Sequence, residues 1–248
     1  GPLIGGFLVG AAGPGAAYGV IAGLFGLAFL IYTTFRPVSQ VVRTKSKGVI
    51  PDLIEVVKVI RERPLLRVNL MFTAINALVL GGMVFIIPAF AKDIFEIGEN
   101  GLGVMFAGVG IGAVAGAMTM SWTGGVRMAG PALLVTDLLF GIFVIFWAHT
   151  SNLIVALPFA FLLGYFNSVH VALGIAVIQF NVPAEVRGRV IGAYEIAWSG
   201  FPLGGLASGS LAAIVGLRSA LTILALGLII FTIVVASVSS RFRQSRIE

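Results

Sequence analysis

The chain has 248 residues, of which 58% are hydrophobic and only 10% are charged, and its formal net charge is +6. Soluble domains carry about 25% charged residues, so this composition excludes an ordinary soluble fold and indicates an all-α membrane protein. The absence of cysteine excludes disulfides and thiolate metal sites, and two histidines are too few for a histidine-based metal cluster.

Eight apolar segments follow one another along the chain, and their continuous apolar character favours spanning helices over barrel strands. The run Gly13-Pro14-Gly15 separates the first two segments. The first, of about 12 residues, would be roughly 18 Å long and too short for a membrane core of about 30 Å. We therefore expect a fragment that begins partway through a helix. The segments are Gly1–Ala12, Ala16–Phe35, Leu65–Phe90, Gly101–Met120, Ala129–Ala148, Leu153–Phe180, Val190–Ile214 and Arg218–Ser239.

The basic residues predict the orientation of these segments. If each segment from the second onward crosses once, 14 of the 16 lysines and arginines fall on one side, and only Lys92 and Arg218 fall on the other. Because cytoplasmic loops are rich in lysine and arginine, the basic side and the C-terminus are predicted to be cytoplasmic. The positive charge then reflects membrane topology, and no nucleic-acid partner is expected.

The long basic connection contains a predicted amphipathic helix from Pro51 to Arg63. Apolar residues recur in it at helical spacing, and acidic residues come early while basic residues come late, which suits the helix dipole. Two interpretations remain: a cytoplasmic helix that joins two bundles, or an anchor in the lipid headgroups. The apolar positions are Ile50, Leu53, Ile54, Val57 and Ile60.

Glycines are spaced for close helix packing in two segments. Gly108, Gly112 and Gly116 stand at four-residue steps in the fourth segment, and Gly200/Gly204 and Gly205/Gly209 do so in the seventh. Such small residues let helix backbones approach in lipid, either for static packing or as smooth faces for helices that move. The sequences GPLIGG at residues 1–6 and GFPLGG at residues 200–205 also form a short repeat six segments apart.

The order of these motifs resembles the major facilitator superfamily, whose fold has two halves of six helices. Gly1, Pro2, Gly5 and Gly6 are similar to the end of the fifth-helix motif of its drug antiporters. Their counterparts in the repeat are Gly200, Pro202, Gly204 and Gly205. The run from Pro183 through Arg187 and Arg189 is similar to the loop before helix eleven, and Asp52 to Arg67 resembles the helix between the halves.

This resemblance implies a partial fold with about eight transmembrane segments, from helix five to helix twelve, most similar to bacterial exporters of drugs and siderophores. Residues 1–35 would end the first bundle and residues 36–64 would be the cytoplasmic connection. Residues 65–240 would form the second bundle and residues 241–248 a cytoplasmic tail. Around Ser121–Arg127 the family's charged motif is reduced to Gly124, Gly125 and Arg127.

Three ionisable residues lie inside predicted spans, where charge is costly and often functional. Asn167, His170 and Gly174 share one helix face, so His170 is a candidate for substrate contact or proton binding, or else for an interhelical hydrogen bond. Glu195 lies on the same side as Trp198 and is a second candidate; alternatively, it reaches water or a loop arginine. For Asp137 we expect a structural bond to a neighbouring helix.

The resemblance adds further candidates. Asn76 and Trp198 would line a substrate cavity together with the residues above, and Arg187 and Arg189 would take part in a cytoplasmic gate or else only mark the topology. Glu185 and Arg189 are spaced for an exposed ion pair.

We therefore predict a secondary transporter, an exporter of a small amphipathic molecule driven by an ion gradient through alternating access. No GxxxxGK[ST] loop is present, so ATP hydrolysis is unsupported. A permease subunit of a multi-component transporter and a membrane-embedded enzyme are the alternatives. The predicted partners are lipid, a small substrate and a proton or other ion, with no cofactor, in a monomer of the plasma or inner membrane. Without the first four helices we expect the 248 residues alone to be inactive.

Overall fold

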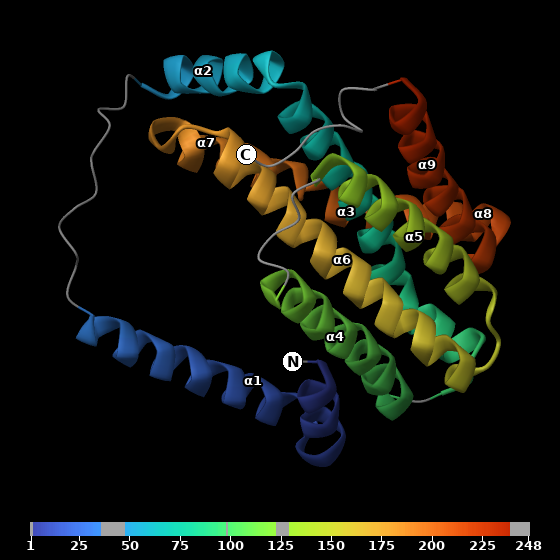
Figure 1. Ribbon diagram of the computed structural model, residues 1–248. Coiled ribbons are helices and arrows are strands. Elements are labelled where there is room, and N and C mark those ends of the chain that lie inside the picture. Colours follow the sequence, from blue (N-terminus) through green and yellow to red (C-terminus); the bar gives the residue numbers. More distant parts are fainter. Residues whose placement is uncertain (1, 36–47, 98, 123–128, 239–248) are drawn as a thin grey trace.

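The computed structural model describes residues 2–35, 48–97, 99–122 and 129–238, and within these ranges every regular element is a helix (Figure 1). The described helices are α1 (Pro2–Thr34), α2 (Val49–Glu62), α3 (Pro64–Asp93), α4 (Glu99–Trp122), α5 (Ala129–His149), α6 (Leu153–Asn181), α7 (Ala184–Ala197), α8 (Gly200–Val215) and α9 (Leu217–Val238). The all-helical membrane fold predicted from the composition is confirmed.

Seven stretches of the described helices are long and apolar enough to cross a membrane, with α7 and α8 counted together as one. Of the eight predicted apolar segments, the first is the one that does not span by itself. It lies in the first part of α1, which kinks at Gly13, where φ is 80° and ψ is 169°. A positive φ is favourable only for glycine, so the predicted break at Gly13-Pro14-Gly15 is present.

The seventh predicted segment differs from the observed helices. A single span over Val190–Ile214 was expected, whereas α7 ends at Ala197 and α8 begins at Gly200. The ring of Pro202 would clash with the carbonyl four residues earlier, at Trp198, and proline has no N–H to bond to it. The chain turns there instead: the Ser199 N–H donates to the Ile196 carbonyl and the Phe201 N–H to the Trp198 carbonyl, both at 3.0 Å.

The predicted amphipathic helix is present as α2, but it uses a different face. Val56 is buried, and Val59 and Ile60 pack partly against the bundle. Four of the five predicted apolar positions remain exposed, because α2 packs against the bundle through the neighbouring positions Val56, Val59 and Ile60. Figure 1 shows α2 lying across the end of the bundle beside α7. These four are Ile50, Leu53, Ile54 and Val57, exposed by 71%, 54%, 63% and 49%.

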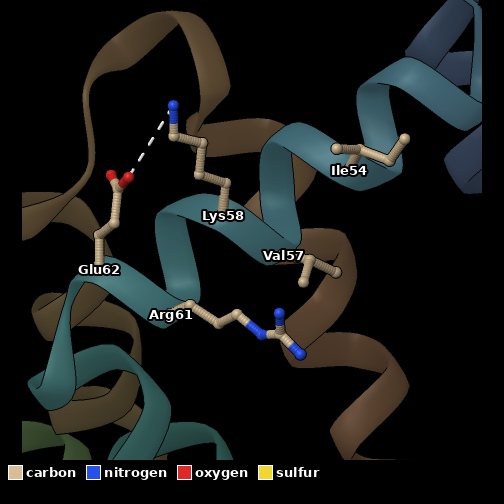
Figure 2. A pocket seen from close by; sticks show the side chains of 5 residues that line it. All are labelled: Ile54, Val57, Lys58, Arg61 and Glu62. Atoms are coloured by element: carbon tan, nitrogen blue, oxygen red, sulfur yellow. Dashed lines mark ion pairs between the residues drawn. The ribbon is translucent and has the colours of Figure 1, made fainter.

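An open groove runs along this outer face of α2 (Figure 2). Ile54 and Val57 contribute apolar walls, and Lys58 and Glu62 form an ion pair of 3.9 Å across one turn. The remaining lining residue, Arg61, extends on the same side as Val57 (Figure 2). The groove faces away from the interior of the bundle, so it plays no part in the polar site described below.

Glycines bring two helix pairs into backbone contact. A Cβ added at Gly112 of α4 would lie 1.8 Å from the Phe161 carbonyl oxygen of α6, and one at Gly164 of α6 would lie 1.9 Å from the Val109 carbonyl oxygen. The crossing of α3 and α8 is as close. A Cβ added at Gly81 of α3 would lie 1.9 Å from the Phe201 carbonyl oxygen, and one added at Gly204 of α8 would lie 1.9 Å from the Leu78 carbonyl oxygen. The close approach expected for the glycines of the fourth segment is therefore present at Gly112 and at Gly116, where an added Cβ would lie 2.5 Å from the Tyr165 oxygen, but at Gly108 the nearest atom would be 3.4 Å away, an ordinary contact.

The helices alternate in direction, so their connections gather at two ends of the bundle (Figure 1). Among the described residues, Lys92 and Arg218 lie at the end opposite α2. The other described basic residues lie on α2, the start of α3 or the start of α7: Lys58, Arg61, Arg63, Arg67, Arg187 and Arg189. The asymmetry seen in the sequence is thus kept in three dimensions.

Candidate functional site

Three polar residues of α3 point into the bundle. Asn69, Thr73 and Asn76 are spaced four and three residues apart, so they share one helix face, and all three are fully buried. The rest of the buried part of α3 is almost entirely apolar, with residues such as Phe72, Val79 and Met83. A polar stripe in such surroundings is costly unless its groups are bonded.

Asp137 of α5 and His170 of α6 meet this stripe, and both are fully buried. The Nδ1 atom of His170 lies 3.0 Å from Oδ1 and 3.1 Å from Oδ2 of Asp137. Asn76 Nδ2 donates to Oδ1 of the same carboxylate at 2.9 Å. The carboxylate is therefore held between a ring nitrogen and an amide, on three different helices.

The other side of the imidazole faces Thr73. Its Nε2 lies 3.5 Å from the Thr73 hydroxyl oxygen, and that hydroxyl donates to the Asn69 carbonyl in its own helix at 2.9 Å. Asn69 Nδ2 donates onward to the Gly174 carbonyl of α6 at 3.1 Å. We call these residues the polar network: Asn69, Thr73, Asn76, Asp137, His170 and Gly174.

Tyr194 of α7 closes one side of the polar network. It is 2% exposed, and a Cβ added at Gly174 would lie 2.9 Å from its hydroxyl oxygen and 3.2 Å from Asn69 Oδ1. Glycine at position 174 thus leaves room for two polar side chains beside the α6 backbone. The side-chain oxygens of Asn69 and Asn76 have no hydrogen-bond partner among the described residues.

The predicted site residues are only partly brought together. Asn76 and His170 belong to the polar network. Asn167 is half-buried one turn away on α6, and its side-chain oxygen is unpaired among the described residues. Glu195 is exposed on α7, and Trp198 is half-buried where α7 ends. The roles assigned to all five remain predictions.

Asn69, Thr73 and Tyr194 were not among the residues predicted for the site, and for Asp137 only a structural bond to a neighbouring helix was expected. Asn69 and Thr73 could have been predicted from the sequence, because their helical spacing places them on the same face of α3 as Asn76. The role of Asp137 could also have been predicted, because two ionisable groups in separate spans, here Asp137 and His170, are less costly when they pair than when they are apart.

The two gate candidates lie at the α2 end of the bundle. Arg187 donates through Nε and Nη2 to the Val182 carbonyl, at 3.3 and 3.2 Å, just after the end of α6. Arg189 Nη1 lies 2.9 Å from Glu55 Oε2 of α2. This ion pair joins α7 to α2 across 134 positions of the chain, and the i,i+4 spacing from Glu185 gave no sign of it.

The motif residues fall in two places. Gly1 lies outside the described residues, as do Gly124, Gly125 and Arg127, while Pro2, Gly5 and Gly6 lie in the first turns of α1. Of the counterparts in α8, Gly200 and Gly204 face α3. A Cβ added at Gly200 would lie 2.7 Å from the Ala74 carbonyl oxygen, and one added at Gly204 would lie 1.9 Å from the Leu78 carbonyl oxygen. Gly205 packs against the Phe85 ring, and Pro202 is exposed.

A metal centre of the usual side chains is not present in the described part of the chain, since no three His, Cys, Asp or Glu residues gather there. The polar network offers instead one carboxylate, one imidazole, amides and a hydroxyl. These groups can bind and release a proton, or hold the polar part of a small molecule.

The bundle of spanning helices with this buried polar network is the structure of a polytopic membrane transport protein. A profile of the Major Facilitator Superfamily matches residues 1–202, and the chain belongs to this superfamily. No curated protein matches the chain. The family makes the chain a secondary transporter, a multi-pass membrane protein that would contact lipid and a small-molecule substrate.

Proposed function

We propose that the protein exports a small amphipathic molecule, such as a drug or a siderophore, at the expense of an ion gradient. The observation that carries this proposal is the polar network, in which a carboxylate and an imidazole are fully buried between spanning helices. Ionisable groups at this depth are costly and mark ion or substrate pathways in membrane proteins. Export is supported by the resemblance of the GPLIGG run at residues 1–6 to the end of the fifth-helix motif of drug antiporters.

The proposed mechanism is alternating access between two helical bundles. Residues 1–35 would end one bundle, residues 65–240 would form the other, and residues 36–64 would connect them on the cytoplasmic side, with residues 241–248 as a cytoplasmic tail. Asn167, Glu195 and Trp198 would contact substrate, because each is less buried than the polar network. The pair of Arg189 and Glu55 would hold α2 to α7 on the cytoplasmic side. In this proposal the protein acts as a monomer in the plasma or inner membrane.

Transport by the full-length protein in proteoliposomes with an imposed ion gradient tests this proposal. A panel of dyes, drugs and siderophores would be offered, and Glu195→Gln and His170→Ala would be compared with the wild type. His149→Ala is the matched control, because His149 is exposed at the end of α5. We expect gradient-driven movement of at least one compound, unchanged in His149→Ala and reduced at least tenfold in His170→Ala.

Two results would count against the proposal. Equal transport by His170→Ala and His149→Ala would remove the polar network from the transport cycle. Movement of substrate only down its own gradient, whatever ion gradient is imposed, would contradict active export.

A further inference from the structure

We propose that the outer face of α2 binds an anionic phospholipid from the leaflet on that side of the membrane. The phosphate of the lipid would lie at Arg61, and its glycerol and upper acyl chain would lie against Ile54 and Val57. This surface is separate from the polar network, and its occupation by lipid does not depend on which molecule the protein transports.

The C-terminal end of α2 lies close to the hydrocarbon layer, because it leads directly into a spanning helix. Only Arg63 separates Glu62, where α2 ends, from Pro64, where α3 begins, and α3 is long and apolar enough to span. The charge of Arg67, exposed in the first turn of α3, keeps that turn out of the hydrocarbon. The four residues from Arg63 to Arg67 rise about 6 Å, and each headgroup layer is about 5–7 Å thick. This end of α2 therefore lies at the level of the headgroups.

Apolar and charged side chains divide around α2 in the way expected of a helix in the membrane interface. Val56 is buried and Ile60 packs partly on the bundle, and together they form one edge of a broad apolar face. The four exposed apolar positions described above continue this face outward. Glu55, Lys58 and Glu62 lie on the opposite side of the helix. Such a helix lies in the plane of the interface, with its apolar face toward the lipid chains and its charged side toward water.

The groove on this face carries a net positive charge, since Lys58 and Arg61 line it together with the single carboxylate of Glu62. Glu62 is paired with Lys58, at 3.9 Å, whereas Arg61 has no ion pair among the described residues. Arg61 extends on the side of Val57, away from that pair (Figure 2). A guanidinium matches the geometry of a phosphate, so one phospholipid satisfies both the charge and the apolar walls of the groove.

The surroundings of the groove also favour an anionic lipid over a zwitterionic one. Arg63 and Arg67 add two positive charges at the same end of α2. Glu55, further along α2, is already paired with Arg189 of α7 at 2.9 Å. Basic residues next to a spanning helix attract anionic headgroups, and each enriches them about fivefold. A zwitterionic lipid would cover the apolar face but would leave this excess of positive charge unbalanced.

Fluorescence quenching of a label on α2 tests the contact with lipid. Bimane is attached to Val57→Cys in the full-length protein without other cysteines, in liposomes of one part phosphatidylglycerol to three parts phosphatidylcholine. A nitroxide near the top of the acyl chain is carried by one lipid or by the other. We expect both lipids to quench the label, with phosphatidylglycerol about fivefold more effective per molecule.

Two further label positions serve as controls. Glu62→Cys lies on the charged side of the same helix, so iodide in the water should quench a label there more strongly than the nitroxide lipids do. Ile50→Cys lies on the apolar face but does not line the groove, so it repeats the depth measurement without a label in the lipid site.

A matched pair of charge variants tests the assignment of the phosphate to Arg61. Arg61→Gln should reduce the preference for phosphatidylglycerol at Val57→Cys toward equal quenching by the two lipids. Lys92→Gln removes the same charge at the opposite end of the bundle, where Lys92 is exposed, and should leave the preference unchanged. An equal preference in the two variants would overturn the role of Arg61.

Three other results would overturn the lipid site. Equal quenching per molecule by the two lipids without any charge variant would mean that α2 touches lipid but does not select an anionic one. Quenching by iodide as strong at Val57→Cys as at Glu62→Cys would place the face in water. A label at Val57→Cys that neither iodide nor the nitroxide lipids reach would mean that protein covers the face, from another part of the chain or from a second copy.

Discussion

At the scale of single residues, Asn76 is the amide donor to the buried carboxylate of Asp137, which also contacts His170. Its amide donates to Asp137 Oδ1 at 2.9 Å, and both side chains are fully buried. Hydrogen bonds between membrane helices average only about 0.6 kcal/mol when both partners can find substitutes. Here the acceptor is a carboxylate enclosed by the bundle, so the loss of one of its hydrogen-bond donors is costly even though His170 remains beside it.

We predict that Asn76→Leu destabilises the protein by about 1–3 kcal/mol, the usual cost of an unsatisfied buried partner. Asn181→Ala is the control, since Asn181 is half-buried and bonds only the Val177 carbonyl of its own helix, at 3.0 Å, among the described residues. It should cost less than about 0.5 kcal/mol. Reversible unfolding in detergent measures both values, and equal losses would mean that the Asn76–Asp137 bond contributes nothing specific.

The limits of the sequence are visible at the same residues. Helical periodicity places Asn167, His170 and Gly174 on one face of α6, and His170 and Gly174 do belong to the polar network. Periodicity within α6 cannot tell which side chain of another helix faces His170. The pairing with Asp137 depends on how α5 and α6 cross, and that crossing is set by packing along both helices.

At the scale of helices, glycines at the crossing of α4 and α6 allow the two backbones to come into contact. We predict that Gly112→Ala destabilises the bundle by about 3 kcal/mol, because its Cβ would lie 1.8 Å from the Phe161 oxygen and overpacking moves the backbone. Gly110→Ala on the same helix is the matched control, with nothing within 4 Å of its Cβ. It should stabilise the helix by up to about 1 kcal/mol.

Thermal unfolding of the two variants in detergent distinguishes them directly. Similar midpoints for Gly112→Ala and Gly110→Ala would show that α4 and α6 can separate without loss, and that the glycines serve another purpose. The four-residue glycine spacing was sufficient to predict this contact, because small residues at that interval form one continuous helix face.

The ion pair between α2 and α7 is expected to be weak. Its side chains are 23% exposed for Arg189 and 35% for Glu55, and solvent screens pairs of this kind. A double-mutant cycle of Glu55→Ala and Arg189→Ala should give a coupling of about 0.5–1 kcal/mol. The cycle on Lys58 and Glu62, which are 74% and 62% exposed, should give about 0.3 kcal/mol or less. A larger value for the second pair would reverse the ranking that exposure predicts.

The sequence could not show which face of α2 packs, nor that α7 and α8 are separate. Val56 and Ile54 are both apolar, yet Val56 is buried and Ile54 is 63% exposed, because the apolar face of α2 is broad and only one edge of it packs on the bundle. The break at Trp198 and Ser199 could not be seen in the hydropathy of the sequence, because the residues on both sides of it are apolar enough for a membrane span. Pro202 was the available signal.

At the scale of the whole molecule, the basic residues predict which end faces the cytoplasm. Single-cysteine variants test this in cells, because the 248 residues contain no cysteine. Glu62→Cys at the α2 end should react with a membrane-impermeant maleimide only after the cells are opened. Asn152→Cys, exposed at the other end between α5 and α6, should react in intact cells. The reverse pattern would invert the orientation while leaving the fold unchanged.

The overall architecture was the part most accessible from the sequence. Lipid requires each spanning backbone to satisfy its own hydrogen bonds, so apolar length predicts helical spans and their order along the chain. The interior of the bundle was less accessible, because the polar network combines residues 69–76 of α3 with Asp137 and His170. Only the packed structure brings residues so distant along the chain together.

The depth of the carboxylate also has an electrical consequence. Asp137 lies near the middle of α5, which runs from Ala129 to His149 across the bundle. A charge that crosses the full membrane gains about 2.3 kcal/mol per 100 mV, so a proton that reaches this depth from one face gains about half of that, or roughly a sevenfold change in occupancy. Membrane voltage would then favour or oppose the entry of any positive charge into the polar network, depending on the face from which that charge enters.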